Sequence, residues 1–351
     1  MMKQKLKIRY IILGVLLLLV WMTQWIPALA TIYSQKVYPV ISSVLSAFSN
    51  LFPLAIGDLF IFLSIAGVIV YPIYARLRKK LSWKKILLRD GEYLLWIYVW
   101  FYLVWGLNYS QKNFYQRSGI PYTAYTPENF QTFVDDYITQ LNRSYTLLNN
   151  INRNLTREES VRLYNQLSDS LAVHRPPHAN PKVKTMLFTP LISMVGVTGS
   201  MGPFFCEFTL NGDLLPVNYP ATYAHELAHL LGITNEAEAN FYAYQVCTRS
   251  KVMGIRFSGY FSVLSHVLGN ARGLLSEEEY TNLFKRIRPE IIEIAKQNQA
   301  YWSAKYSPII GDVQDWIYDL YLKGNKIGSG RKNYSEVIGL LISYQESLKR
   351  K

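Results

Sequence analysis

The residues best suited to chemistry lie in the segment Tyr223–Gly232, which reads YAHELAHLLG. His225 and His229 are four positions apart, so on a helix both imidazoles lie on one face and can reach one metal ion. Glu226 follows the first histidine, which places its carboxylate beside the metal position rather than on it. From there it can accept a proton from a metal-bound water molecule. This spacing predicts a hydrolytic zinc centre with His225 and His229 as ligands and Glu226 as general base.

A third protein ligand is expected nearby, because a catalytic zinc ion usually has three such ligands and one position for water. Gly232 is suited to end the first helix in a left-handed turn. Asn235 can cap the next helix, and Glu238, three residues later, can complete a capping box. Glu236 points about 200° away from Glu238 around this helix. We therefore prefer Glu236 as the third zinc ligand, with Glu238 or another group as the alternative.

Further polar residues are expected around this centre. Asn240 lies four positions after Glu236 on the same helical face, where its side chain can orient a histidine or glutamate ligand. Hydrolysis of a carbonyl compound also needs a donor that stabilises the oxyanion. The sequence does not rank the candidates for this role, which are Tyr219, Tyr242, His266 and Tyr334.

The motif as a whole resembles that of a known group of enzymes. The His-Glu-x-x-His segment is followed by a helix of the form Glu-x-x-Ala-Asn-x-x-Ala. This pattern, from Ala221 to Gln245, resembles the zincin metallopeptidases whose third ligand is glutamate, the gluzincins. The resemblance implies that His225, His229 and Glu236 bind Zn²⁺ and that Glu226 is the general base of peptide hydrolysis. The interval between the second histidine and the third ligand is shorter here than in the thermolysin branch.

The charge distribution indicates a membrane rather than nucleic acid. The formal net charge is +13, and most of it comes from four basic residues in 1–9 and seven in 76–89. Both clusters border apolar runs, as Lys and Arg do at the cytoplasmic ends of membrane helices. The rest of the chain is nearly neutral. We therefore expect no nucleic-acid partner.

Three apolar runs predict transmembrane helices, at about residues 10–30, 55–75 and 93–109. About 20 such residues cross a hydrocarbon core of roughly 30 Å. The first run is too long for the core of a typical signal peptide. The third is rich in Trp and Tyr, and its alternative is a buried or interfacial helix. Residues 1–109 are thus expected to form a membrane region, with a basic cytoplasmic loop at 76–89.

Three crossings would place residues 110–351 outside the cytoplasm, because basic residues keep the N-terminus and the loop on the cytoplasmic side. The expected location is the bacterial inner (cytoplasmic) membrane, with a periplasmic domain. The expected partners are the lipid bilayer and a peptide or protein substrate, and the oligomeric state is not indicated. Cys206 and Cys247 would either pair there as a disulfide or stay buried thiols.

The second part of the chain is long enough for a sizeable core and shows an α+β pattern with much more helix than strand. Capping patterns predict helix starts at Thr126, Thr156 and Ser276. Two strands are predicted at 183–189 and 204–210. The second strand is expected to be either the edge strand that aligns substrates in zincins or an ordinary core strand.

The whole layout also resembles an uncharacterised bacterial membrane family, domain of unknown function 3810. The expected fold is α+β and mainly helical, with three N-terminal transmembrane helices before a zincin-like domain with a small sheet. The expected function is that of a membrane-anchored zinc-dependent peptidase. The alternative is a membrane-tethered, zincin-like binding or signalling module with little or no turnover. The intact Glu226 favours the enzyme, because pure binding needs no base beside the metal.

Overall fold

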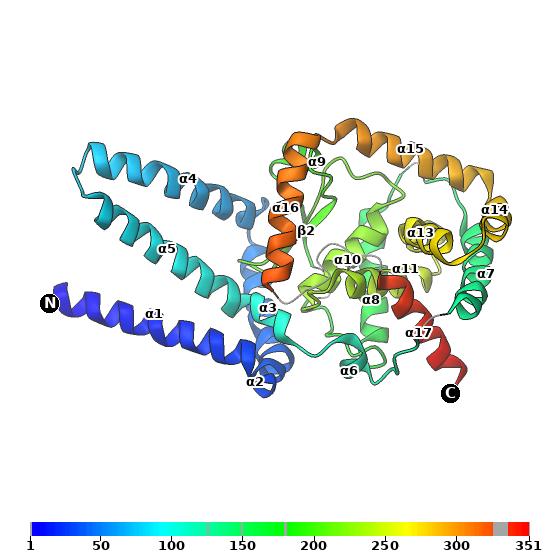
Figure 1. The fold of residues 1–351 in the computed structure, drawn as a ribbon, viewed down its shortest axis with the longest axis horizontal. Coiled ribbons are helices and arrows are strands. Elements are labelled where there is room, and N and C mark those ends of the chain that lie inside the picture. The colour runs from blue at the N-terminus through cyan, green and yellow to red at the C-terminus, as the bar shows by residue number, and fades with distance from the viewer. Residues whose placement is uncertain (1, 125, 149, 179–180, 326–335, 351) are drawn as a thin grey trace. The chain divides into compact units, whose positions relative to one another are not determined.

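The computed structural model describes the chain in two compact units (Figure 1). The residues described are 2–124, 126–148, 150–178, 181–325 and 336–350. Unit 1 comprises residues 1–111 and 202–207, and unit 2 comprises residues 112–201 and 208–351. The division lies close to the boundary expected after residue 109. The inclusion of residues 202–207 in the first unit was not expected.

Unit 1 consists of three long helices and a connecting segment. The long helices are α1 (Met2–Trp25), α4 (Ile56–Leu77) and α5 (Trp83–Val104). Between α1 and α4 lie α2 (Pro27–Ile32), the π-helix η1 (Tyr33–Val37) and α3 (Tyr38–Ser49), and the 3₁₀-helix η2 (Gly106–Ser110) follows α5. The ring of a proline clashes with the residue before it when that residue is helical, so this residue is usually extended. Ile26 is accordingly extended, and α1 ends at Trp25 rather than near residue 30.

Two helices within the described residues are long and apolar enough to cross a membrane, so the expected number of three was wrong. The candidate spans are Ile8–Trp25 and Ile56–Leu77. The helix α5 is not apolar enough to be a candidate span. Its first half carries charged residues, and its second half is rich in Tyr and Trp, which have low hydropathy. Its charged residues are Lys84, Lys85, Arg89, Asp90 and Glu92. Much of the expected basic loop is therefore helical.

This difference removes the basis for placing residues 110–351 outside the cytoplasm. After two crossings, the chain returns to the side on which it started. If α1 and α4 both cross, the two basic clusters lie on the same side of the bilayer whether or not α5 crosses it, because one is at the start of α1 and the other begins at the end of α4. The positive-inside rule is thus satisfied by either arrangement. The charge pattern by itself does not determine the side of unit 2.

Unit 2 is mainly helical, as expected. Its helices are α6 (Phe114–Ser118), α7 (Pro127–Ser144), α8 (Arg153–Leu167), α9 (Thr189–Ser193), α10 (Tyr219–Leu230), α11 (Glu236–Thr248), α12 (Met253–Ser262), α13 (Leu264–Leu274), α14 (Glu277–Lys285), α15 (Pro289–Lys305), α16 (Pro308–Gly324) and α17 (Val337–Lys349). Thr126 and Ser276 cap α7 and α14, which confirms two predicted starts. The start predicted at Thr156 was wrong, because Asn152 caps α8 one turn earlier.

The sheet is small and has the order β1–β3–β2, with β1 (Val183–Thr185), β2 (Gly199–Gly202) and β3 (Glu207–Leu210). The strands β1 and β3 are parallel, with Val183 opposite Phe208. The strand expected at 204–210 is therefore central rather than at an edge, and it is buried along its length. The edge strand β2 was not expected, because glycine carries no side chain that could show the alternation of a strand.

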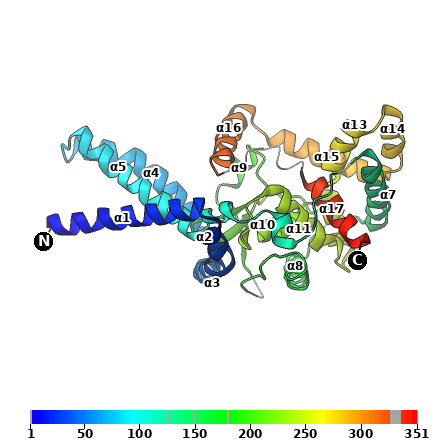
Figure 2. The same ribbon diagram turned by 60° about the horizontal axis from the view of Figure 1, so that its bottom comes forward.

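The helices α10 and α11 form the centre of unit 2 (Figure 2). They pack against each other, and α8 and α12 pack against both of them. Large side chains on the two helices, such as Tyr223 and Phe241, are completely buried. The Tyr164 hydroxyl of α8 donates a hydrogen bond to the Ala224 carbonyl of α10. The motif helices therefore lie in the hydrophobic core, where surrounding side chains hold them in place.

Gly232 makes the turn between these helices, and its replacement tests that turn. Its φ is +91°, as predicted for a left-handed helix end, and this region disfavours side chains. We expect Gly232→Ala to destabilise the protein by about 1 kcal/mol. Gly269→Ala, inside α13 with open space around the new methyl group, should instead stabilise it slightly. Thermal unfolding of the full-length protein in detergent measures both, and equal effects would contradict the role of Gly232.

Candidate metal centre

The side chains of His225, His229 and Glu236 converge near the turn that connects α10 to α11. The Nε2 atoms of the two histidines are 3.0 Å apart. The Oε2 atom of Glu236 lies 3.1 Å from Nε2 of His225 and 3.4 Å from Nε2 of His229. In the part of the chain that the structure describes, this is the one group of three His, Cys, Asp or Glu side chains with ligand atoms so close together. The fold thus brings together the three residues that the sequence suggested as ligands.

The triangle of donor atoms fits a zinc ion. Zinc binds nitrogen and oxygen ligands at about 2.0–2.2 Å, so two ligands of a tetrahedral site are about 3.3–3.6 Å apart. The observed separation of 3.4 Å lies in this range, and those of 3.0 and 3.1 Å are slightly below it. Two imidazoles with one carboxylate are also a donor set that occurs in catalytic zinc sites, where a fourth position stays open.

Each imidazole is oriented by a hydrogen bond on its other nitrogen. Nδ1 of His229 donates to the carbonyl oxygen of Ile233 at 2.6 Å, and Nδ1 of His225 donates to Oδ1 of Asn240 at 2.8 Å. Because carbonyl oxygens only accept hydrogen bonds, the proton of each neutral ring lies on Nδ1. Each Nε2 then has a lone pair available for a metal. Asn240 is therefore placed as the sequence suggested, against His225.

Burial and neighbouring charges shift the pKa values of His229 and Glu236 in opposite directions. Burial lowers the pKa of His229, but the adjacent Glu236 carboxylate outweighs it and raises this pKa to about 9. Burial raises the pKa of Glu236, whereas the two imidazoles more than reverse this effect and hold it well below its ordinary value. Glu236 therefore stays ionised, as a carboxylate ligand must be.

Glu226 is a buried carboxylate next to the ligand group. Burial raises its pKa, and the interactions with the His225 and His229 side chains only partly offset this shift. Among the described residues, its Oε2 atom has no hydrogen-bond partner. A side chain on Gly199 of β2 would overlap this carboxylate, so glycine is required there. A buried polar atom without a partner is costly, and a water molecule or substrate proton would satisfy it.

Tyr318 of α16 is a site residue that the sequence did not reveal. Its hydroxyl donates a 2.7 Å hydrogen bond to Oε1 of Glu236, while Oε2 faces the histidines. The two residues are 82 positions apart, and α16 contains no motif that points to this contact. Among the expected oxyanion donors, Tyr242 instead donates to the Leu171 carbonyl, and Tyr334 lies outside the described residues.

The remaining candidates are placed elsewhere. Tyr219 begins α10 and His266 lies on α13. No hydrogen bond connects either of them to the ligand group within the described parts of the chain. Cys206 and Cys247 are separate buried thiols, so the disulfide considered from the sequence is not formed. Burial raises the pKa of the Cys247 thiol to about 12, which keeps it protonated.

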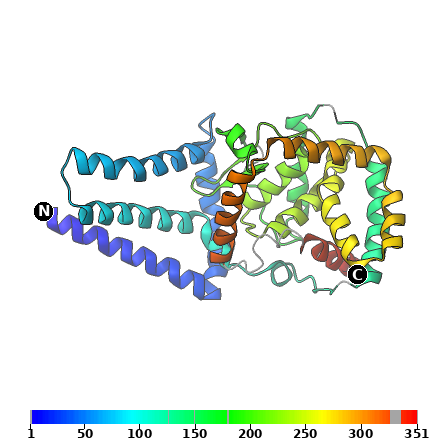
Figure 3. The same cartoon turned by 45° about the horizontal axis from the view of Figure 1, so that its top comes forward.

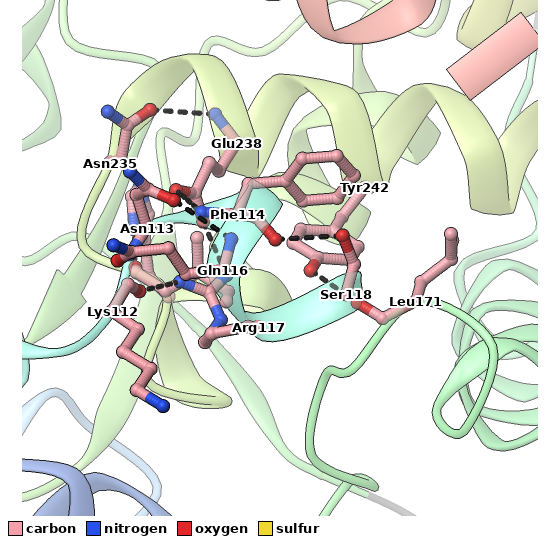
Figure 4. A network of polar contacts seen from close by, with 12 residues as sticks. Lys112, Asn113, Phe114, Gln116, Arg117, Ser118, Leu171, Asn235, Glu238 and Tyr242 are labelled. Carbon is pink, nitrogen blue, oxygen red and sulfur yellow. Dashed lines mark hydrogen bonds and ion pairs between the residues drawn. The ribbon is translucent and has the colours of Figure 1, made fainter. Parts of the chain in front are cut away.

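Glu238 is engaged in a buried ion pair, not in the ligand group (Figure 4). Its Oε2 lies 2.5 Å from the guanidinium of Arg117, and its Oε1 accepts a hydrogen bond from the backbone N–H of Phe114. Asn235 caps α11 by accepting from the Glu238 N–H, as predicted, but the Glu238 carboxylate does not complete the capping box. The pair therefore ties α6 to the same helical turn that carries Glu236.

Breaking this pair should destabilise unit 2 strongly. The substitution Arg117→Leu leaves Glu238 buried without its cation, which costs about 3–5 kcal/mol. The pair between Arg286 and Asp135 is half-exposed, so Arg286→Leu should cost at most about 1 kcal/mol. Chemical unfolding of the full-length protein in detergent compares the two variants. A loss as small for Arg117→Leu as for Arg286→Leu would contradict the structural importance of the pair.

Removing the Tyr318 hydroxyl should weaken metal binding. Groups that hold metal ligands in place contribute roughly 10- to 100-fold to affinity, so Tyr318→Phe should bind zinc at least about tenfold more weakly. Tyr301→Phe is the matched control, because the Tyr301 hydroxyl donates to the Asp213 carbonyl instead. Competition with a chromophoric chelator measures both affinities. Equal affinities for the two variants would show that the hydrogen bond to Glu236 does not support the site.

Comparison with known proteins places the chain in a family. No curated protein and no solved structure matches it. A family model described as "Protein of unknown function (DUF3810)" matches residues 33–342. The match extends from η1 to α17 and includes the His225–Glu236 site. This chain is accordingly a member of the DUF3810 family of proteins of unknown function.

Proposed function

We propose that this protein is a membrane-anchored, zinc-dependent peptidase. The proposal rests on one observation, the convergence of His225, His229 and Glu236 beside the buried carboxylate of Glu226. A binding or signalling module would need the three ligands but not the adjacent base. The same four residues are those that the resemblance to gluzincins assigns to zinc binding and catalysis.

The ligand group would hold the ion through Nε2 of His225, Nε2 of His229 and Oε2 of Glu236. When bound, zinc would polarise the scissile carbonyl and lower the pKa of water. The side chain of Asn240 and a backbone carbonyl keep the two imidazoles in the required orientation. The hydroxyl of Tyr318 restrains the second oxygen of Glu236. The ligands are thus preorganised by contacts that remain outside the coordination sphere.

Glu226 would act as the general base and then as the general acid. It would take a proton from the attacking water and later deliver it to the leaving amine. Burial raises its pKa towards the range in which a carboxyl group exchanges protons efficiently near neutral pH. The backbone of Met201 hydrogen-bonds the carboxylate, and Gly199 leaves room for it. Strand β2 therefore holds the base in position.

The same strand supports a polypeptide as the substrate. Among the described strands, β2 is at the edge of the sheet and has β3 on one side only. An extended peptide can add to such an edge through backbone hydrogen bonds. Because Gly199 and Met201 contact Glu226, a peptide paired with β2 would lie close to the base. This arrangement favours hydrolysis of peptide bonds over that of small-molecule amides.

The bilayer would be the second partner of the protein. The two apolar helices α1 and α4 provide the anchor. The proposed location is the cytoplasmic membrane of a bacterium. The basic residues at the start of α1 would keep the N-terminus on the cytoplasmic side.

Zinc content and turnover should respond differently to substitutions in the site. We expect His229→Ala and Glu236→Ala to lose stoichiometric zinc, because each removes a ligand. Glu226→Gln should keep the metal but lose at least about 100-fold in peptide hydrolysis, because the amide cannot accept the proton. Elemental analysis of the full-length protein in detergent measures zinc, and mass spectrometry of a peptide library measures cleavage.

A matched variant controls for effects on folding. His266→Ala removes a histidine outside the site and should keep both zinc and activity. Full activity of Glu226→Gln would refute the assigned base, and unchanged zinc in Glu236→Ala would refute the third ligand. A zinc-loaded wild-type protein that cleaves no peptide in the library would favour the binding module instead.

A further inference from the structure

The connection between the two candidate spans has an unusual composition. Residues 37–57 contain no Asp, Glu, Lys or Arg, yet they do not form a spanning helix. The helix within this connection, α3, has 12 residues and is therefore about 18 Å long. This length is well short of a hydrocarbon core of roughly 30 Å. A short apolar helix of this kind belongs either in a protein core or at a membrane surface.

The exposure of its side chains distinguishes these two cases. Val40 and Val44 are each 63% exposed, whereas Ser42 and Ser46 are each 4% exposed. The spacing of four residues places the valines on one face of the helix and the serines on another. A helix that faces water buries its apolar side and exposes its polar side. The polarity of α3 is the reverse, which indicates an apolar environment around its outer face.

The buried serines do not need outside partners. Ser42 donates a hydrogen bond to the Pro39 carbonyl, and Ser49 donates to the Ser46 carbonyl in the same helix. These internal bonds satisfy the hydroxyl donors, and such small side chains allow close packing of helices. The helix α3 packs in this way against η1 and α5. Its inner face is therefore fully used by contacts within unit 1.

The chain connectivity places α3 at a membrane surface. If α1 and α4 cross the bilayer, the connection from Trp25 to Ile56 must start and end on the same side. Within unit 1, α3 runs across the ends of the three long helices instead of alongside them (Figure 3). Trp21 and Trp25 are exposed near the end of α1, as is typical of residues at the headgroup level. These features describe a helix that lies in the plane of the membrane.

We propose that α3 is an interfacial helix that inserts its outer face into the lipid acyl chains at the bilayer surface. The outer face consists of Val40, Val44 and Phe48, and Val37 just before the helix and Leu51 just after it extend this face; all five side chains are exposed. Lipid is the occupant because this face carries no charge or polar group that would select a protein partner. Beyond its C-terminal end the chain continues into α4, a candidate span with many exposed apolar side chains. The inference is independent of the zinc site.

Spin labels in the full-length protein test this proposal. A cysteine is introduced by Val44→Cys, labelled with a nitroxide and reconstituted into vesicles of phosphatidylethanolamine and phosphatidylglycerol. The native thiols of Cys206 and Cys247 are completely buried and should not react. We expect label 44 to be severalfold more accessible to oxygen than to a water-soluble nickel chelate. Leu147→Cys, at an exposed apolar residue of unit 2, should show the reverse preference.

The outcome separates lipid from water and from protein. Nickel accessibility at position 44 as high as at position 147 would overturn the proposal, because the outer face would then be hydrated. Dipolar broadening between labels on neighbouring chains would also overturn it, because a second copy would cover the face. A label introduced by Val40→Cys repeats the measurement on the same face, so that a local disturbance at position 44 does not decide the result.

Discussion

The reversal of the chain between α10 and α11 is the constraint on which the proposed metal centre depends. His229 and Glu236 are only seven positions apart in the sequence, so their side chains can meet only if the chain reverses its direction within these few residues. Gly232 permits this turn because it adopts a φ that other residues avoid, and Asn235 then starts the next helix. Since both helices are buried, the imidazoles and the carboxylate attract each other with little screening by water.

The three buried glutamates of this region differ in how their charges are satisfied. Glu238 is paired with Arg117, and Glu236 lies against two imidazoles. The charge of Glu226 is offset only in part, and one of its oxygen atoms lacks a partner among the described residues. Buried charged groups that are not fully compensated cost stability, and they often occur at catalytic or binding sites. The contrast between the three carboxylates thus supports separate roles for them.

Unit 1 shows that apolar composition alone does not predict a helix long and apolar enough to span a membrane. The helix α5 is long enough to span, but its first half is charged. The connection that contains α3 carries a single charged residue, Lys36, but it is interrupted into short helices, and Pro27 and Pro39 lie at two of the helix starts. Helix length and charge placement must both be satisfied for a crossing. Only α1 and α4 satisfy both among the described residues.

The sequence by itself determined the parts of the site that depend on local structure. The spacing of His225 and His229, the glycine turn and the cap of α11 are set by neighbouring residues, and these bring Glu236 and Asn240 close to the histidines. The tertiary structure alone decided the rest. Arg117 and Tyr318 reach their glutamates across 121 and 82 positions, and β2 is a glycine strand without a periodic pattern. Such contacts arise from packing between distant elements, and packing leaves no short-range signal in a single sequence.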